Sequence, residues 1–521
     1  RVPVPAGGTA TATVTADTRV GATDGHHTGR IVARSGDTVA VTPFAVHREV
    51  ESYTLTVRHL DDTGAPAADH ATTLVDQADS TSIDLYDPDG TVRARVPKGR
   101  YSLVSLLFSG EGEDARVALT ARPELTVDRD TEVTVDGRTA KPVRMTVPDR
   151  EATPQLVDIG ATVLAENGNS YGFGLLGFDF TGLRTAQFGP DGDADRFVGT
   201  LGSQWADGEA ASSPYLYALS EGFPGRLPTG FERHYRARDL TTVTHRFRGG
   251  YAGMEAERAV FPEVAGVGGW AVVLPTAVPG QRVEHYSARG VRWNSELTFG
   301  VRAEEGWLEP RAVLASDPRT YRPGQHLRET WNTAPYGPSF PAPRWPGQGI
   351  TRQGDLILVD VPLHSDANGH AGGSLPDSAR TALYRDGKLV GESADPGFGQ
   401  FEVPPAAAGY RLETTTRRSF TDLSTEVGVS WTFRSRHVPG DGFAALPAMA
   451  VRFAPPLDAA NTAPAGRSFA IPVTVQRQPG APGARVAALT VEVSYDGGAT
   501  WQRARTHRTG GGWTATVRHP A

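Results

Sequence analysis

Three aspartates in one loop of this sequence could bind a metal ion. Asp191, Asp193 and Asp195 place carboxylates at alternate positions, which is the spacing of the oxygen donors that begin a calcium-binding loop. Arg196 stands where such loops have a glycine at the sixth position, and no glutamate follows at the twelfth. The three aspartates are therefore candidate calcium ligands, with a solvated acidic loop as the commoner arrangement.

A second loop offers mixed nitrogen and oxygen donors. His364, Asp366, Asn368 and His370 lie within seven residues of one another. A metal ion could be held by such a set, but a polar turn capped by the Asp366 side chain is the commoner arrangement. Both interpretations stay open at the level of sequence.

The motifs of several enzyme classes are missing. The sequence has no Gly-x-Ser-x-Gly nucleophile turn, no His-Glu-x-x-His zinc motif, no phosphate-binding loop and no dinucleotide-binding Gly-x-Gly-x-x-Gly. It has no cysteine, which excludes thiolate nucleophiles and cysteine-bound metals. The paired carboxylates of glycoside hydrolases have no fixed spacing, so that class remains open as a weaker hypothesis.

Histidines and tryptophans give two further hypotheses. His234 and His245 flank Asp239, as a general base and its orienting carboxylate could, although histidines on surface strands are commoner. Six of the nine tryptophans lie between Trp205 and Trp345. Indole rings stack on sugar rings, so this region could bind carbohydrate, but tryptophans in a sandwich core are commoner.

The segment from Ser494 to Trp501 matches the Asp-box pattern Ser-x-Asp-x-Gly-x-Thr-Trp of sialidase propellers. In such a turn Asp496 binds the backbone amides of the Gly497-Gly498 turn, Thr500 begins the return strand and Trp501 packs on the hairpin. A single copy, without an arginine cluster beside it, predicts a structural hairpin rather than a sialidase site.

The elements that would position these residues are strands. Apolar and polar residues alternate with period two at 9–15, 54–58 and 514–518, and turn formers such as Asp386-Gly387 separate apolar runs. The chain contains 60 glycines and 39 prolines in 521 residues, a density that argues against long helices. We therefore expect an all-β protein.

Charge and hydropathy narrow the range of partners. The net charge is −7, and no lysine- or arginine-rich run occurs, so nucleic acid is not an expected partner. No apolar run of roughly 18 residues exists, so no membrane association is expected.

The strand and turn pattern predicts several β-sandwich modules in tandem. Residues 1–50 hold about four short strands, which is half a sandwich and implies a partner that covers it. Residues 51–147 have the strand and turn pattern of transthyretin-like or carboxypeptidase-regulatory-like sandwiches. Residues 148–455 form a large β-rich region with room for two modules, and residues 456–521 an immunoglobulin-like sandwich that is incomplete.

Several segments together resemble one family. Residues 4–17, 329–338, 369–373 and 381–390 are similar to the C-terminal accessory region of large secreted actinobacterial subtilisin-like serine proteases. In that family a fibronectin type III-like module follows the catalytic domain, and residues 1–50 resemble the C-terminal part of it.

The resemblance implies a secreted, extracellular parent enzyme whose Asp/His/Ser triad lies outside this chain. The family's Gly-Thr-Ser-Met nucleophile motif is absent here, as are its aspartate and histidine motifs, so no catalytic residue is assigned. We expect a non-catalytic fragment that braces the catalytic domain and shapes access to it. Its expected partners are the N-terminal catalytic fragment of the same precursor and the parent's protein or peptide substrate, and no cofactor is expected besides calcium. The alternative is an array of carbohydrate-binding modules.

Overall fold

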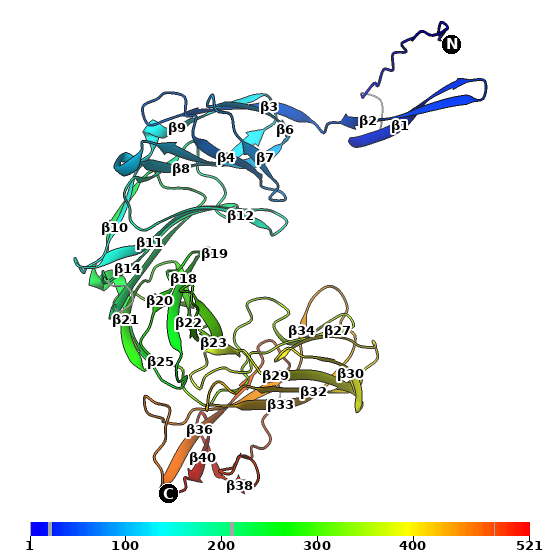
Figure 1. Cartoon of the computed structure of the whole chain (residues 1–521). Coiled ribbons are helices and arrows are strands. Elements are labelled where there is room, and N and C mark those ends of the chain that lie inside the picture. Colours follow the sequence, from blue (N-terminus) through cyan, green and yellow to red (C-terminus); the bar gives the residue numbers. More distant parts are fainter. Residues whose placement is uncertain (1, 19–22, 209–212, 484) are drawn as a thin grey trace.

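The computed structural model describes residues 2–18, 23–208, 213–483 and 485–521. Its sheets follow one another along a curved path from the N-terminal hairpin to the C-terminal module (Figure 1). Helix in these residues is limited to three 3-10 turns: η1 (Gly112–Asp114), η2 (Gly137–Thr139) and η4 (Ala237–Asp239). None of the described helices is long and apolar enough to cross a membrane. The expected all-β fold of tandem sandwiches is confirmed.

The N-terminal module is one exposed hairpin. β1 (Gly25–Ser35) pairs antiparallel with β2 (Thr38–Arg48) over its whole length, and the pair lies apart from the other sheets (Figure 1). The expectation of about four strands in this region is wrong, because the alternating residues 9–15 form no strand. Alternation is not sufficient for a strand, since the backbone N–H and C=O groups also need a neighbouring strand.

The next module is a sandwich of a three-stranded and a seven-stranded sheet. The smaller sheet has the order β6 (Thr91–Pro97), β3 (Ser52–Leu60), β9 (Thr131–Asp136). The larger has the order β16 (Phe231–His234), β10 (Lys141–Thr146), β13 (Leu183–Gln187), β8 (Arg116–Val127), β7 (Gly99–Ser109), β4 (His70–Asp76), β5 (Ser82–Leu85). Because β13 and β16 come from later in the chain, this sheet crosses the boundary expected at residue 147.

The central module is a larger sandwich of two sheets. The first has the order β12 (Ser170–Gly177), β11 (Thr153–Leu164), β14 (Phe197–Ala206), β15 (Tyr215–Pro224), β21 (Gly280–Ser287), β17 (Leu240–Phe247), β25 (His326–Trp331). The second has the order β19 (Val267–Gly268), β18 (Glu255–Val264), β22 (Val291–Arg302), β23 (Leu308–Ala315), β28 (Ala371–Ser374), with β20 (Leu274–Pro275) on β18 and β24 (Arg319–Thr320) on β22.

These two modules share apolar layers and form one stack of four sheets. One core joins side chains of the seven-stranded sheet around β8 to side chains of β11 and β14, for example Leu119 to Ile159 and Leu201. A further core lies between β14 or β15 and the sheet around β18. Every residue of β14 is consequently buried, which explains why it carries apolar or small residues on both faces.

The fourth module is a further sandwich of two four-stranded sheets, with strands between residues 349 and 445. One sheet has the order β31 (Phe398–Glu402), β27 (Leu356–Asp360), β26 (Gly349–Gln353), β34 (Ala444–Ala445). The other has the order β30 (Lys388–Ser393), β29 (Ser378–Arg385), β32 (Ala408–Arg417), β33 (Glu426–Ser435). The predicted turn joins β29 and β30, with φ values of 47° at Asp386 and 83° at Gly387.

The last module is the smallest of the sandwiches. Its main sheet has the order β35 (Met449–Phe453), β36 (Ser468–Arg477), β40 (Gly512–Arg518), β39 (Arg505–Thr509), and it faces the pair β37 (Glu492–Val493) and β38 (Gln502–Arg503). Because β35 belongs to this sheet, the module begins before the boundary expected at residue 456. Its core is built around Phe469, Val473 and Ala515.

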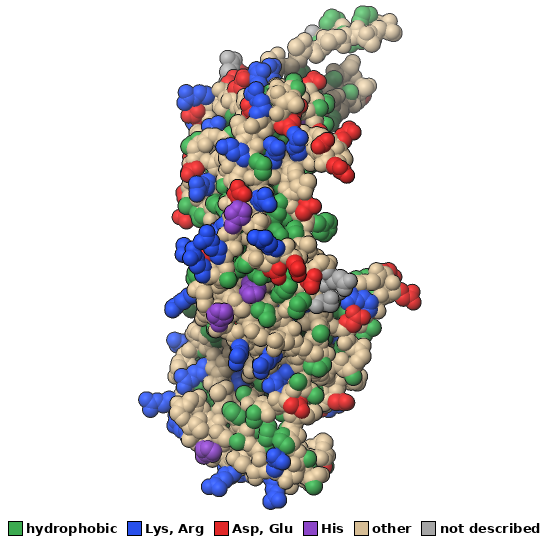
Figure 2. Space-filling model, turned by 90° about the vertical axis from the view of Figure 1, so that its left-hand side faces the viewer, with side chains coloured by type: hydrophobic (Ala, Val, Ile, Leu, Met, Phe, Trp, Pro, Cys, Tyr) green, Lys and Arg blue, Asp and Glu red, His purple; other side chains and the backbone are tan. Residues whose placement is uncertain are grey.

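The surface mixes charges of both signs. Figure 2 shows basic and acidic side chains interspersed over one face of the molecule. Exposed ion pairs such as Arg292 with Glu263, 2.8 Å apart, contribute about 0–1 kcal/mol each. The apolar layers between the sheets therefore hold the stack together.

Candidate functional site

The loop from His364 to His370 lies where the central module meets the fourth module, the sandwich that contains β27. Asp366 is buried and its Oδ1 accepts hydrogen bonds from the backbone N–H groups of Asn368 and His370, both at 3.0 Å. Its Oδ2 lies 2.9 Å from Nδ1 of His370. The capped polar turn is thus the arrangement that forms, and the Asn368 side chain ties it to the neighbouring segment by donating to the Thr330 carbonyl at 2.7 Å and the Thr333 hydroxyl at 2.8 Å.

This loop contacts a buried polar network inside the central sandwich. The ring of His370 stacks on Trp331 at 3.6 Å, and Nε1 of Trp331 donates to Nδ1 of His245 at 3.1 Å. Because Nδ1 of His245 accepts this bond, its Nε2 carries the proton and faces Glu284 at 3.1 Å. Arg258 binds Glu284 through two bonds of 2.6 and 2.9 Å.

The network is sealed from solvent. His245, Arg258, Glu284 and Trp331 are each at most 1% exposed. Burial works to raise the pKa of Glu284, but Arg258 and His245 outweigh it and hold that pKa well below its usual range. Burial lowers the pKa of His245, so it is neutral at neutral pH. A substrate cannot reach these groups, which argues for a structural role.

The proposed grouping of His234, Asp239 and His245 does not form. His234 is exposed and its Nδ1 lies 2.7 Å from the Thr146 hydroxyl, while Asp239 accepts a hydrogen bond from the backbone of Arg236. His245 is buried instead of lying on the surface, because it lies on the inner face of β17 with Val243 and Phe247, while Arg246 on the other face is exposed.

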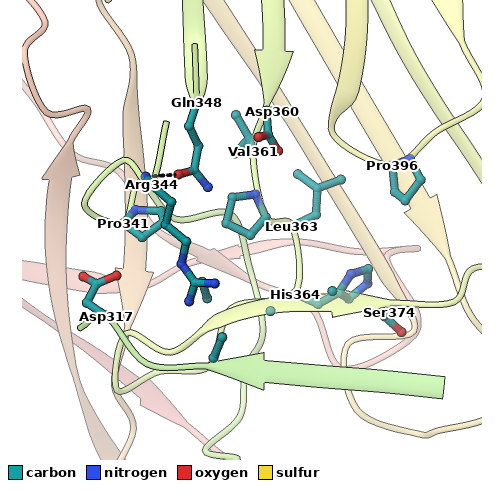
Figure 3. Close-up of a pocket in the computed structure, with 15 residues that line it drawn as sticks. Asp317, Pro341, Arg344, Gln348, Asp360, Val361, Leu363, His364, Ser374 and Pro396 are labelled. Carbon is teal, nitrogen blue, oxygen red and sulfur yellow. Dashed lines mark hydrogen bonds between the residues drawn. The ribbon is translucent and has the colours of Figure 1, made fainter. Parts of the chain in front are cut away.

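A cavity of about 260 Å³ lies beside the loop, at the junction of β23, β28 and β27. Figure 3 shows Arg344 extending into it, with Asp317 on one side and His364 on the other. The Gln348 side chain accepts a hydrogen bond from the Arg344 backbone at 2.7 Å (Figure 3). Asp360 and Ser374 also line the cavity.

This cavity lacks an activated nucleophile. Burial, and then the charge of Arg418, lower the pKa of His364 to about 3, and its Nε2 is buried without a hydrogen-bond partner. The Ser374 hydroxyl accepts from Arg418 at 3.1 Å instead of pairing with the histidine. Covalent catalysis needs a nucleophile next to a base, and Ser374 and His364 in this cavity do not form that pair.

Buried histidines also occur in the second module, where sequence reasoning missed them. His59 and His70 stack at 3.8 Å, and Nε2 of His59 lies 2.8 Å from the Thr72 hydroxyl. Burial, and then His70, lower the pKa of His59 to about 4. The alternation of β3 and β4 could have placed both residues on the inner face.

Acidification is expected to weaken this module through His59. The pKa of His59 in the folded chain lies below the ordinary 6.5. As the pH falls below 6.5, the unfolded chain therefore binds a proton that the folded chain does not, and the folding equilibrium shifts toward the unfolded state. At about 1.4 kcal/mol per pH unit, roughly 2–3 kcal/mol is lost between pH 6.5 and 4.5. Urea unfolding at a series of pH values should give a shallower slope for H59Q than for the unmodified chain. Equal slopes would contradict this assignment.

The structure does not gather the three predicted calcium ligands. Asp191 accepts a hydrogen bond from the Gln187 side chain at 2.8 Å, and Asp193 accepts one from the backbone of Asp195 at 2.9 Å. No three histidine or carboxylate side chains converge on one ion position among residues 2–18, 23–208, 213–483 and 485–521. The Asp193 side chain therefore caps its own turn, and the three carboxylates do not converge on one position.

The Asp-box hairpin forms, but the prediction that Asp496 binds the amides of the Gly497-Gly498 turn is wrong, because the Gly498 amide donates to the Ser494 hydroxyl at 2.9 Å. Asp496 accepts hydrogen bonds from the backbone N–H of Thr500 at 2.9 Å and from its hydroxyl at 2.5 Å. Trp501 donates to the Gly498 carbonyl at 3.1 Å. The Thr500 hydroxyl, with further bonds from Thr500 N–H and Ser494, lowers the pKa of Asp496 to about 2. The motif is structural here, since its polar groups are used within the turn.

The tryptophans divide into core and surface. Trp205, Trp293 and Trp331 are buried, as the core interpretation predicts, whereas Trp270, Trp307 and Trp345 are exposed. Trp345 donates to Asp360 at 3.0 Å. Trp270 borders a hollow in the surface, which makes it the tryptophan of most interest.

That hollow, called the Trp270 trough here, is a cavity of about 270 Å³ whose lining is Asp158, Gly160, Thr162, Gly172, Phe173, Gly174, Leu176, Thr200, Val267, Gly268 and Trp270. β12 lies across from β19 at this edge of the central sandwich (Figure 1). Gly174, Gly160 and Thr200 stand opposite one another on three adjacent strands, and Asp158 follows in the next row. The floor is deep because these side chains are small.

Comparison with known proteins assigns no family. No family model and no curated protein matches the chain. The solved structures it is similar to include the Bacillus anthracis TIE protein, at 10% identity over 58% of this chain and 57% of that chain, with a TM-score of 0.13. Another is the major pilin subunit BcpA of Bacillus cereus, at 9% identity over 54% and 98%, with a TM-score of 0.13. The Streptococcal ancillary pilin matches at 12% identity over 54% and 99%, with a TM-score of 0.12.

This chain thus spans a little over half of the TIE protein. TM-scores of this size carry no argument about fold or function. The functional conclusions below rest on the residues themselves.

Proposed function

We propose that this chain is a non-catalytic β-scaffold of a secreted hydrolase and that its N-terminal hairpin docks on another part of the same precursor. In keeping with the family resemblance, that part is the catalytic fragment of a subtilisin-like serine peptidase. The scaffold braces this fragment and limits how substrate reaches its cleft.

The observation that carries the proposal is that both faces of the β1–β2 hairpin are exposed to solvent. In the register of this hairpin, Ile31, Phe44 and Val46 fall on one face, where Phe44 lies over Gly29. Ile31 is 39% exposed and Phe44 38% exposed. A lone two-stranded hairpin is marginal in water, so this apolar face favours a partner that completes the sheet or covers it.

The opposite face of the hairpin has a different character. It carries Arg30 and Arg34 beside Val32, Val39 and Val41. Burying these two arginine charges at the centre of an interface costs free energy unless acidic groups of the partner pair with them. The partner is therefore expected on the face that carries Phe44.

The chemistry of the chain agrees with a scaffold. Among the described residues, no serine hydroxyl hydrogen-bonds to a histidine; the hydroxyls that do so belong to Thr72, Thr146, Thr242, Tyr286 and Tyr495. Hydrolysis by a serine nucleophile needs that pairing. The bond cleaved by the parent stays open between a peptide and an ester.

The stack is also well tied along its length, as a brace requires. Arg452 of β35 donates to the carbonyls of Gly337 and Pro338 at 2.9 and 2.8 Å. Asn461 donates to the carbonyl of Gly249 at 2.6 Å. Both residues link the last module to loops that lead out of the central sandwich, so these modules are held in a defined arrangement.

A pair of variants on β2 tests the proposal. F44D places a charge on the apolar face and should weaken binding of the catalytic fragment encoded upstream by about 30-fold or more, as loss of a central interface residue does. V41D places the same charge on the opposite face of the same strand and should change binding less than about threefold. Isothermal titration with the separately expressed upstream fragment measures both.

Activity gives the second readout. The chain alone should not hydrolyse casein or chromogenic esters. Turnover by the chain alone that a serine-directed phosphonate abolishes would overturn the proposal, as would equal effects of F44D and V41D on binding.

A further inference from the structure

We propose that the Trp270 trough binds a neutral saccharide, with the indole of Trp270 against one face of a pyranose ring and the Asp158 carboxylate accepting hydrogen bonds from its hydroxyl groups. This inference goes beyond the scaffold function and does not depend on the hairpin or its partner.

The floor of the trough is the outer face of β11 and β12, where Gly160, Gly172 and Gly174 leave the backbone uncovered. The other face of these strands carries Ile159, Ala161 and Phe173, which pack in the core. A Cβ atom on Gly160 would lie 2.5 Å from the Thr200 hydroxyl oxygen, so a larger residue there would force the Thr200 side chain to move. At Gly174 a Cβ atom would meet nothing closer than 3.8 Å, so packing does not require glycine there. Glycine at that position leaves space that a valine, the more favourable residue in a strand, would fill.

The wall of the trough holds Trp270 in place through its backbone. The Trp270 amide donates to Oδ2 of Asp158 at 3.3 Å, and its carbonyl accepts from the Gln204 side chain at 3.1 Å. Gln204 also accepts from the Val272 amide at 3.2 Å. The segment is anchored by buried groups, yet the indole itself is 60% exposed. A large apolar ring fixed by its backbone and left open to solvent is available to a ligand.

Asp158 is an unusual group for a purely structural position. It is 8% exposed, and the long bond from the Trp270 amide is the one hydrogen bond its carboxyl makes among the described residues. Burial raises its pKa to about 6, with the Trp270 amide opposing that effect. Because the folded pKa lies above the ordinary 3.8, the ionised carboxylate lowers stability at neutral pH. A carboxylate retained at such a cost, facing a cavity, favours a binding role.

The lining selects the ligand class. It contains one carboxyl group, the hydroxyls of Thr162 and Thr200, one indole and no basic side chain. Anionic ligands would meet only repulsion from Asp158, and quaternary ammonium ligands are held by several aromatic rings. A sugar has a C–H face for a single ring and hydroxyls along its edge for the carboxylate and the threonines. The neutral saccharide fits all the groups present.

Titration of the whole chain with soluble neutral hexasaccharides tests the inference. Cellohexaose, xylohexaose, laminarihexaose and mannohexaose are added while tryptophan fluorescence and heat are recorded. We expect saturable binding of at least one of them below about 10 mM, with the fluorescence change lost in W270A. D158N and G174V should each weaken that binding by about tenfold or more, through the lost acceptor and the filled trough.

Two controls separate binding from folding. W307A removes a tryptophan that is equally exposed but lies outside the trough, and it should leave affinity unchanged. D158N should raise the thermal unfolding midpoint at pH 7, so its loss of binding cannot come from misfolding. Failure of all four sugars to bind, or binding that W270A and D158N leave intact, would overturn the inference while leaving the scaffold function untouched.

Discussion

Replacing Glu284 by glutamine is expected to lower the free energy of unfolding of the central sandwich by about 3–5 kcal/mol. Glu284 and Arg258 are fully buried and joined by two hydrogen bonds, and His245 and Tyr286 also point to the carboxylate. Glutamine keeps the shape but leaves the Arg258 charge without an opposite charge in a site that water does not reach. That uncompensated charge is the source of the loss.

A surface pair in the same sandwich provides the control. Glu263 on β18 pairs with Arg292 on β22 at 2.8 Å, with both side chains partly exposed. E263Q should cost less than about 1 kcal/mol, because solvent screens the remaining charge. Urea unfolding followed by the fluorescence of buried Trp293 and Trp331 compares the two variants. A loss below about 1 kcal/mol for E284Q would contradict the role given to this network.

Replacing Asn461 by alanine is expected to lower the free energy of unfolding by about 3–5 kcal/mol, since three buried backbone groups each lose a hydrogen bond and two of them are left without a partner. Its side chain donates to the carbonyls of Gly249 and Asn332 at 2.6 and 2.8 Å and accepts from the Ala334 amide at 3.0 Å. Asn461 also has a φ of 61°, a conformation that asparagine tolerates better than alanine.

Two further variants isolate the cause. N461G relieves the backbone strain but does not restore the side-chain hydrogen bonds. Its free energy of unfolding should therefore be lowered by most of the amount expected for N461A. N167A removes an exposed asparagine with a 3.1 Å bond to the Asp79 carbonyl and should cost about 0.5 kcal/mol or less. If N461G is as stable as the unmodified chain, the bonds between modules contribute little.

Local chemistry made part of this structure predictable. The Asp386-Gly387 turn and the Asp-box hairpin form as expected, because turn residues and short-range hydrogen bonds depend on a few neighbouring residues. The capped turn at Asp366 follows the same logic. Strand alternation was also informative wherever one face of the strand is buried, as in β36 and β40.

Long-range pairing was not predictable in this way. The parallel pairing of β13 with β8 moves a strand across a module boundary, and the full burial of β14 follows from sheets on both sides. The same stacking buries His245, which the sequence placed on the surface. The Trp270 trough combines residues of β11, β12, β14 and the segment after β19, so no pattern within one segment predicts the whole trough. Glycines at alternate positions of β12 are the one signal that could have drawn attention to it.

Hydrogen exchange of the β1–β2 amides is the measurement that tests the scaffold proposal most directly. In the chain alone, amides of residues 25–48 should exchange much faster than those of β14, because the hairpin has no covering layer. After addition of the upstream catalytic fragment, exchange in the hairpin should slow markedly, and F44D should prevent that change. Hairpin exchange that stays as fast in the presence of the fragment would contradict the account.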